Sequence, residues 1–197
     1  MLAFLGAAAL AAGAIFVAEF GDKSQLLILA FATRYAARPV ILGVVAAAAV
    51  VQGLSVAVGA VLGAALPEQA VGLVAGVAFL AVAAWTLRGE DDGEHEALAA
   101  PRPRALTGVA LVVTVAGTFV VAELGDKTML ATFALAASQG PLATWIGSTI
   151  GEVAANLVAV AVGRQVGTRL SARAVRIGSA VLFAVAGALV LLGAIVR

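Results

Sequence analysis

Two short segments of this sequence place acidic, basic and hydroxyl side chains at a fixed spacing inside long apolar stretches. The first is Glu19–Ser24, with the sequence EFGDKS, and the second is Glu123–Thr128, with the sequence ELGDKT. Each segment contributes two carboxylates and one lysine. Charged side chains are costly at the depth of a lipid bilayer, and where they occur they have a task or a partner. We therefore expect these two segments to form the functional site.

The charges of the two segments suit a divalent cation that is exchanged for protons. Each segment carries a net charge of −1, so one divalent cation or two protons would neutralise the pair. Carboxylate and hydroxyl oxygens are suitable ligands for Ca²⁺, Mn²⁺ and Mg²⁺. The chain has no cysteine, and its one histidine, His95, lies outside the apolar stretches, which disfavours Zn²⁺ and Cu⁺. We predict four cation ligands: Glu19, Asp22, Glu123 and Asp126.

On a continuous helix, residues three and four positions apart project from one face. Glu19, Asp22 and Lys23 would then share a face, and so would their counterparts in the second segment. The glycine in each segment weakens the helix, and a local break would free backbone carbonyl oxygens as further ligands. We expect supporting roles for the other glycine and polar positions: Gly21, Lys23, Ser24, Gly125, Lys127 and Thr128.

The alternative is that each glutamate only forms an ion pair with the lysine four residues later. The pairs would be Glu19 with Lys23 and Glu123 with Lys127. This interpretation leaves the aspartate of each segment without a lysine and gives no reason for the duplication. We therefore favour a functional site in which the lysines hold the carboxylates in place.

The overall composition is that of an integral membrane protein. The 197 residues are 63% hydrophobic and 12% charged, with a mean hydropathy of +1.11. Soluble domains are about 45–50% apolar and about 25% charged. The net charge is +1 without a basic tail, so nucleic-acid binding is not expected. Hydrolase and phosphate-loop motifs are absent, so we expect neither an enzyme nor a cofactor.

Six apolar runs without internal proline divide the chain, and each permits a helix. They extend over residues 2–33, 40–66, 70–87, 105–137, 142–162 and 177–196. We predict an all-α polytopic membrane protein with six transmembrane helices. Residues 1–88 would form a first three-helix repeat and residues 105–197 a second, joined by a cytoplasmic acidic linker at 89–104. We interpret that linker as a solvated loop rather than a cation sensor, because its spacing does not match an EF-hand.

The two halves correspond at an offset of 104 positions. This offset relates the two charged segments, and it also relates Gly43 to Gly147 and Gln52 to Asn156. Because each half has three spans, the second half enters the membrane from the opposite side. The sequence therefore predicts an inverted repeat, the architecture of many secondary transporters.

The arginines predict how the chain is oriented. Nine of them follow the first, third and fifth runs, and the tenth is the terminal Arg197. By the positive-inside rule their side is cytoplasmic, which places both termini on the outer face. Residues 1–18 lack a basic region and correspond to 105–122, so we expect a retained span rather than a signal peptide.

Four further polar residues in the apolar runs are candidate accessory groups. Glu152 has no acidic counterpart, and it is either a proton relay, a second cation ligand or a carboxylate hydrogen-bonded to a neighbouring helix. Gln52 and Asn156 either line the ion pathway or bond between helices. Gln25 follows the first charged segment where its counterpart is Met129, which makes the two segments inequivalent.

The duplicated E-x-G-D-K-[S/T] pattern in a three-plus-three chain resembles the transmembrane protein 165 family. The resemblance covers nearly the whole chain, and both segments match the family motif in full. It implies a manganese or calcium transporter that exchanges the cation for protons. The compact chain is similar to bacterial members, for which the implied role is manganese export across the inner (plasma) membrane.

We therefore expect a secondary transporter that exports Mn²⁺ from the cytoplasm in exchange for protons, with Ca²⁺ as the other candidate ion. Its expected partners are the lipid bilayer, the cation and protons, and the sequence indicates no particular oligomeric state. Three alternatives remain open. They are an exporter of a small amino acid or other organic ion, an intramembrane hydrolase that uses paired carboxylates, and a structural membrane subunit.

Overall fold

The computed structural model describes residues 1–19, 23–88, 106–166 and 172–196, and every regular element in these ranges is an α-helix. The predicted all-α class is therefore confirmed. The acidic linker at 89–104 lies outside the described residues. In chain order the helices are α1 (Leu2–Glu19), α2 (Lys23–Arg34), α3 (Ala37–Ala65), α4 (Glu68–Arg88), α5 (Gly108–Glu123), α6 (Lys127–Gln139), α7 (Pro141–Val166) and α8 (Ala172–Val196).

The first and fourth apolar runs each form two helices instead of one. Between α5 and α6 the chain bends by 80°. The expectation that Glu123, Asp126 and Lys127 share one face of a continuous helix is therefore wrong. The local break expected at the glycine is present, because Gly125 has a φ of +84°, which residues with a Cβ rarely adopt.

Several helices are long and apolar enough to cross a membrane. Within the described residues these are α1, α3 and the part of α4 from Gln69 to Arg88, and a fourth span results if the bent pair α5–α6 counts as one. The six spans expected from the sequence remain a prediction.

Several helix boundaries of the two halves fall at corresponding residues. α1 and α5 end at Glu19 and Glu123, while α2 and α6 begin at Lys23 and Lys127. Each of these pairs is 104 positions apart. The offset found in the sequence therefore also describes the local structure of the two halves.

Close contacts between helices follow the same offset. A Cβ added to Gly43 on α3 would lie 2.9 Å from the carbonyl oxygen of Val112 on α5. At the corresponding place, a Cβ added to Gly147 on α7 would collide with the carbonyl oxygen of Ala8 on α1. Glycine thus allows close approach of α3 to α5 and of α7 to α1.

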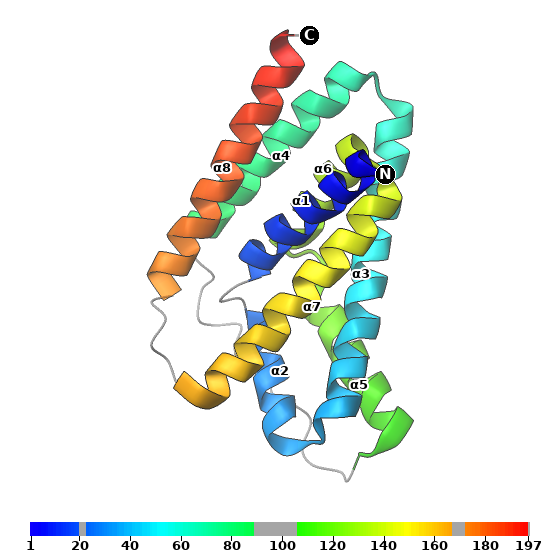
Figure 1. The fold of residues 1–197 in the computed structure, drawn as a ribbon, viewed down its shortest axis with the longest axis vertical. Helices are drawn as coiled ribbons and strands as arrows, with labels where there is room; N and C mark the ends of the chain where they lie inside the picture. The colour runs from blue at the N-terminus through cyan, green and yellow to red at the C-terminus, as the bar shows by residue number, and fades with distance from the viewer. Residues whose placement is uncertain (20–22, 89–105, 167–171, 197) are drawn as a thin grey trace.

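The helices pack as two groups (Figure 1). α1 lies along α7, and α3 packs against both α5 and α6. α4 and α8 lie side by side, and α4 connects this pair to the remainder chiefly through α6. Phe79 of α4 stacks on its counterpart Phe183 of α8, with 6.0 Å between the ring centroids.

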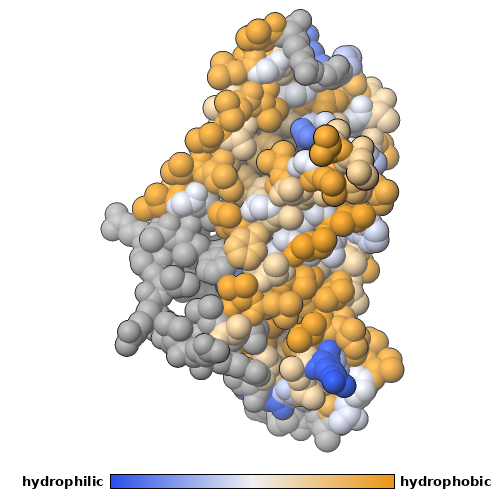
Figure 2. Space-filling view, viewed as in Figure 1, coloured by the Kyte–Doolittle hydropathy of each residue, from blue (hydrophilic) through white to orange (hydrophobic). Residues whose placement is uncertain are grey.

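The described part of the face shown in Figure 2 is largely apolar. Large hydrophobic side chains are exposed along several helices, among them Val109 at 78% and Leu189 at 65%. Conversely, Glu19, Gln52 and Glu152 are fully buried. A surface that is apolar outside and polar groups that are buried inside are what a lipid environment favours.

Candidate cation site

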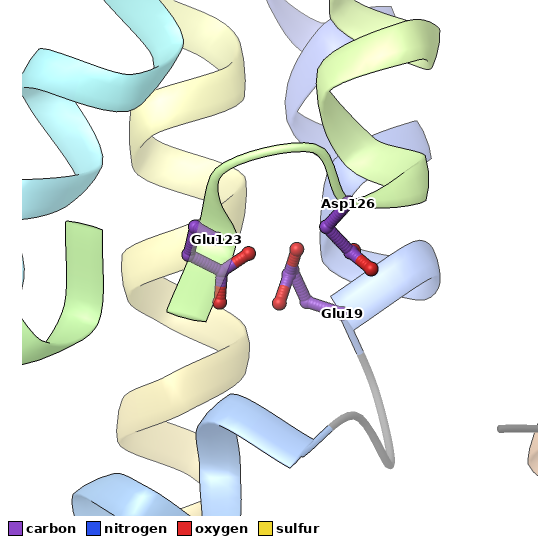
Figure 3. Close-up of side chains that lie close together, drawn as sticks. All are labelled: Glu19, Glu123 and Asp126. Atoms are coloured by element: carbon purple, nitrogen blue, oxygen red, sulfur yellow. The ribbon is translucent and has the colours of Figure 1, made fainter. Parts of the chain in front are cut away.

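Three carboxylates from three different helices meet in the interior. Glu19 is the last residue of α1, Glu123 is the last residue of α5, and Asp126 immediately precedes α6. One oxygen atom from each lies within 4.8 Å of the other two, and all three side chains are buried. In Figure 3 the Glu19 carboxylate lies between those of Glu123 and Asp126. Two charged segments that are distant in sequence are thus brought together at one point.

The break between α5 and α6 positions the two acidic residues of the second segment. The Asp126 amide donates to the Glu123 carbonyl oxygen at 3.1 Å, which closes a tight turn around Gly125. The Gly125 amide donates to the Met129 sulfur at 3.0 Å. Asp126 is the N-cap of α6, and its Oδ2 accepts from the Thr128 amide at 3.5 Å. The positive end of the α6 dipole therefore lies at an acidic residue, which stabilises the carboxylate.

Two side chains of α2 support Glu19. The Ser24 hydroxyl donates to the Glu19 Oε2 at 3.3 Å, and the Gln25 Nε2 donates to the Glu19 carbonyl oxygen at 2.7 Å. Ser24 is fully buried. Glu19 is therefore fixed both through its carboxylate and through its backbone at the end of α1.

The other predicted motif residues fall partly outside the described structure. Residues 20–22, which include Gly21 and Asp22, lie outside it, and so does the side chain of Lys23. The role expected for Asp22 therefore remains a prediction. In the second segment, Lys127 is 9% exposed and Thr128 is 1% exposed, so both belong to the interior near the carboxylates.

The arrangement of oxygens is suited to a hard divalent cation. Two ionised carboxylates with oxygen atoms within 4.8 Å repel each other by more than about 3 kcal/mol at an effective dielectric constant of about 20. Three such groups in a buried place need protons, a cation or basic side chains to compensate the repulsion. Carboxylate oxygens are the ligands that Ca²⁺ and Mn²⁺ accept. Either a bound divalent cation or protons would therefore compensate the charge of this cluster.

Three of the four candidate accessory residues form a hydrogen-bonded network apart from the cluster: Gln52, Glu152 and Asn156. Gln52 of α3 donates through Nε2 to the Glu152 Oε2 of α7 at 2.6 Å, and its Oε1 accepts from the Thr132 hydroxyl of α6 at 2.7 Å. Asn156 donates through Nδ2 to the backbone oxygen of Glu152 at 3.0 Å. The Gln52 side chain thus links α3 to α6 and α7, whereas the Asn156 amide donates to a carbonyl oxygen of its own helix. The two counterparts therefore have different surroundings.

Sequence reasoning missed several buried polar residues around these groups. Thr132 is fully buried beside Gln52, and Thr144 and Ser148 are fully buried on α7. The signal for the last two was present, because Thr144, Ser148 and Glu152 follow one another at intervals of four residues. Thr132 also follows a polar residue, Thr128, at an interval of four, but its partner Gln52 lies 80 positions away and was not predictable from spacing.

The conformation of Gly125 leads to a first prediction. An alanine at this φ of +84° costs about 1–2 kcal/mol of backbone strain, while the space around the added Cβ is open. We expect Gly125→Ala to lower both the thermal midpoint of the detergent-solubilised protein and its rate of Mn²⁺ transport. Gly117→Ala on α5 is the matched control, because its Cβ also meets nothing within 4 Å and its backbone is helical. Equal behaviour of the two variants would show that the turn does not require glycine.

Comparisons with known proteins identify the family. The sequence model of the divalent cation/proton antiporter GDT1 matches residues 7–94 and 111–196. A Vibrio cholerae protein named "Putative manganese exporter" is 31% identical over 170 residues, which cover 85% of this chain and 81% of that protein. A GDT1-like protein of Synechocystis is 31% identical over 183 residues, which cover 86% of this chain and 88% of the relative.

A plant relative is longer than this chain. The chloroplastic protein PAM71 of Arabidopsis thaliana is 30% identical over 194 residues, which cover 87% of this chain and 52% of PAM71, so the chain spans about half of that relative. No solved structure matches this chain. The family resemblance carried by the two charged segments is confirmed, and the family is one of transporters rather than enzymes. The chain belongs to the GDT1 family of divalent cation/proton antiporters.

Proposed function

We propose that this protein exports Mn²⁺ from the cytoplasm in exchange for protons, and that Ca²⁺ is the other ion it accepts. The observation that carries this proposal is the buried cluster of Glu19, Glu123 and Asp126, whose oxygens lie within 4.8 Å of one another. The manganese assignment is supported by the name of the Vibrio cholerae relative. Asp22, the counterpart of Asp126, would be the fourth ligand.

The exchange follows from the charges of the two segments. With four carboxylates and two lysines the site carries −2, which either one divalent cation or two protons balance. Protonation from the outer side would release the cation, and deprotonation on the cytoplasmic side would prepare the site for the next one. Lys23 and Lys127 hold the carboxylates and set the net charge. Gly125 shapes the turn between α5 and α6, Ser24 and Thr128 add a hydroxyl beside each acidic pair, and Gly21 is the counterpart of Gly125.

The proposed architecture is six spans in a three-plus-three inverted repeat, with residues 1–88 and 105–197 as the two halves. Three observations support it. Several helix ends of the halves are related by 104 positions, and so are the starts of the two matched family ranges at residues 7 and 111. The stacking of Phe79 on its own counterpart, Phe183, is what a local two-fold axis produces.

We place the protein in the bacterial inner (plasma) membrane with both termini on the outer face. The positions of the arginines after the first, third and fifth runs support this orientation. The N- and C-terminal ends both lie in the upper part of Figure 1, and the connection from α2 to α3 lies at the opposite end. A chain that crosses the membrane an even number of times has this arrangement.

Reconstitution into liposomes tests the transported ion and the exchange. We expect purified protein to take up Mn²⁺ when the lumen is acidic, and the lumen to become less acidic as Mn²⁺ enters. Excess Ca²⁺ should compete, whereas small amino acids should not, because the acidic cluster repels their carboxylate. Protein-free liposomes are the control. A rate of Mn²⁺ uptake that does not depend on the pH gradient would exclude exchange for protons. Uptake of amino acids instead of Mn²⁺ would favour the organic-ion exporter.

Growth of bacteria tests the direction. A strain without its own manganese exporter should be sensitive to added Mn²⁺, and expression of this chain should restore its growth. Parallel cultures with added Ca²⁺ or Mg²⁺ show which ions are exported. Greater sensitivity to Mn²⁺ on expression would indicate import and contradict the proposed direction.

A further inference from the structure

One face of α7 carries a continuous row of buried polar side chains. Its members are spaced by four residues, which places them above one another on a helix. All four are fully buried: Thr144, Ser148, Glu152 and Asn156. The corresponding face of α3 is apolar over the same length except at its last position, with Val40, Val44, Ala48 and Gln52. The polar row is therefore a feature of the second half only.

Two oxygens in this row lack a hydrogen-bond partner within the described residues. They are the Oε1 of Glu152 and the Oδ1 of Asn156, both buried. The other carboxylate oxygen of Glu152 is held by Gln52 at 2.6 Å. A buried oxygen without a donor is unfavourable, and a site of this kind is expected to receive a ligand for part of its functional cycle. The two oxygens belong to side chains four residues apart on one face of α7, and together they offer an oxygen-only environment.

The row lies beside the three-carboxylate cluster. Thr132, which joins the network through Gln52, is six residues after Asp126 on α6, or about 9 Å along a helix with a rise of 1.5 Å per residue. The charge of Glu152 is close enough to that of Asp126 for the two to interact. Glu152 therefore lies toward the C-terminal end of α6, which is the outer side in the proposed topology.

We propose that Glu152 and Asn156 form a second oxygen site for the divalent cation, which the ion occupies in transit between the cluster and the outer face. This inference rests on the proposed function. Gln52 positions the carboxylate by fixing Oε2, which leaves Oε1 for the ion. The Ser148 and Thr144 hydroxyls continue the row toward the start of α7 and offer further oxygens. The network closes this route in the present structure, because none of its side chains reaches the surface.

A substitution that keeps the shape of the Glu152 side chain and removes its charge separates two roles for this residue. One is cation binding, and the other is only the hydrogen bond to Gln52. Glu152→Gln retains an oxygen that accepts from Gln52, whereas it lacks the negative charge that binds a cation. Glu152→Asp retains the charge and shortens the side chain. Thr114→Val on α5 is the control, because the Thr114 hydroxyl bonds only to the Ala110 carbonyl oxygen of its own helix among the described residues.

The experiment combines Mn²⁺ binding, followed by electron paramagnetic resonance of the purified full chain, with Mn²⁺ uptake by proteoliposomes. We expect Glu152→Gln to bind Mn²⁺ within about threefold of wild type and to transport it about 10- to 100-fold more slowly. Glu152→Asp should recover much of the rate, and Thr114→Val should match wild type. Glu123→Gln, which alters the cluster, should lose both binding and transport.

Several outcomes would overturn the proposal. Wild-type transport by Glu152→Gln would show that no cation needs this carboxylate, while the proposed function would stand. If Glu152→Gln lost as much Mn²⁺ binding as Glu123→Gln, Glu152 would belong to the three-carboxylate cluster. A separate second site would then be excluded. Absence of Mn²⁺ binding and transport in the wild-type protein would contradict both the second site and the proposed function.

Discussion

Replacing Asp126 by asparagine should reduce Mn²⁺ transport to the level of protein-free liposomes while the protein still folds. The change removes one of the three carboxylates whose oxygens lie within 4.8 Å of one another. It also leaves the remaining charges unable to balance a divalent cation. Asparagine is as good an N-cap as aspartate, so the start of α6 is retained. The measurement is initial uptake of Mn²⁺ in proteoliposomes, with the amount of inserted protein determined for each variant.

The same result is expected for Asp22→Asn, because Asp22 is the counterpart of Asp126 in the first segment. Thr118→Val is a suitable control, since the Thr118 hydroxyl donates to the Thr114 carbonyl oxygen one turn earlier on α5. Elution of every variant as a single species from a sizing column would show that folding is preserved. Full transport by Asp126→Asn would exclude this carboxylate as a ligand and with it the proposed cation site.

Replacing Gly147 by valine should strongly destabilise the protein. A Cβ at this position collides with the carbonyl oxygen of Ala8 and lies 2.9 Å from the Cβ of Ala11. The obstacle is helix backbone, so relief requires α1 and α7 to separate along a contact that runs through much of both helices. Overpacking in a well-packed interior typically costs about 1–3 kcal/mol, and a valine adds two further methyl groups to the clash. Moving α1 would also displace Glu19 at its end.

The expected result is a large fall in the thermal midpoint of the detergent-solubilised protein, measured by the fraction that remains monodisperse after heating. Gly13→Val on α1 is the matched control, because a Cβ there meets nothing within 4 Å. Gly43→Val should act like Gly147→Val, since its Cβ would lie 2.7 Å from the Cβ of Val115. A midpoint for Gly147→Val equal to that of Gly13→Val would show that α1 and α7 are not in close contact.

The elements that the sequence predicts well are those that depend on local composition and spacing. Apolar runs without proline predicted helices, and the helices are present. The glycine inside the second charged segment predicted a break, and α5 ends two residues before it. The offset of 104 positions, found in the sequence, also relates several helix boundaries, among them the ends of α1 and α5. In each case the information lies within a few residues or in a repeated pattern along the chain.

The expected common face of the second segment failed for a physical reason. The i, i+3, i+4 rule holds only while the helix is continuous, and Gly125 ends that continuity with a φ of +84°. The bend of 80° then sends α6 in a new direction from α5. The acidic residues nevertheless remain close, because the turn keeps Asp126 hydrogen-bonded to Glu123.

By itself the sequence determined an all-helical chain with a lipid-compatible composition and a duplicated acidic motif, and it named the candidate ligands for a divalent cation. Only the tertiary structure decided that Glu19 meets Glu123 and Asp126. It also decided that Gln52 bonds to Glu152 rather than to Asn156, the counterpart of Gln52. These contacts join residues about a hundred positions apart. They depend on how closely the helices approach and at what angle the chain bends, and neither quantity is contained in the periodicity of a single helix.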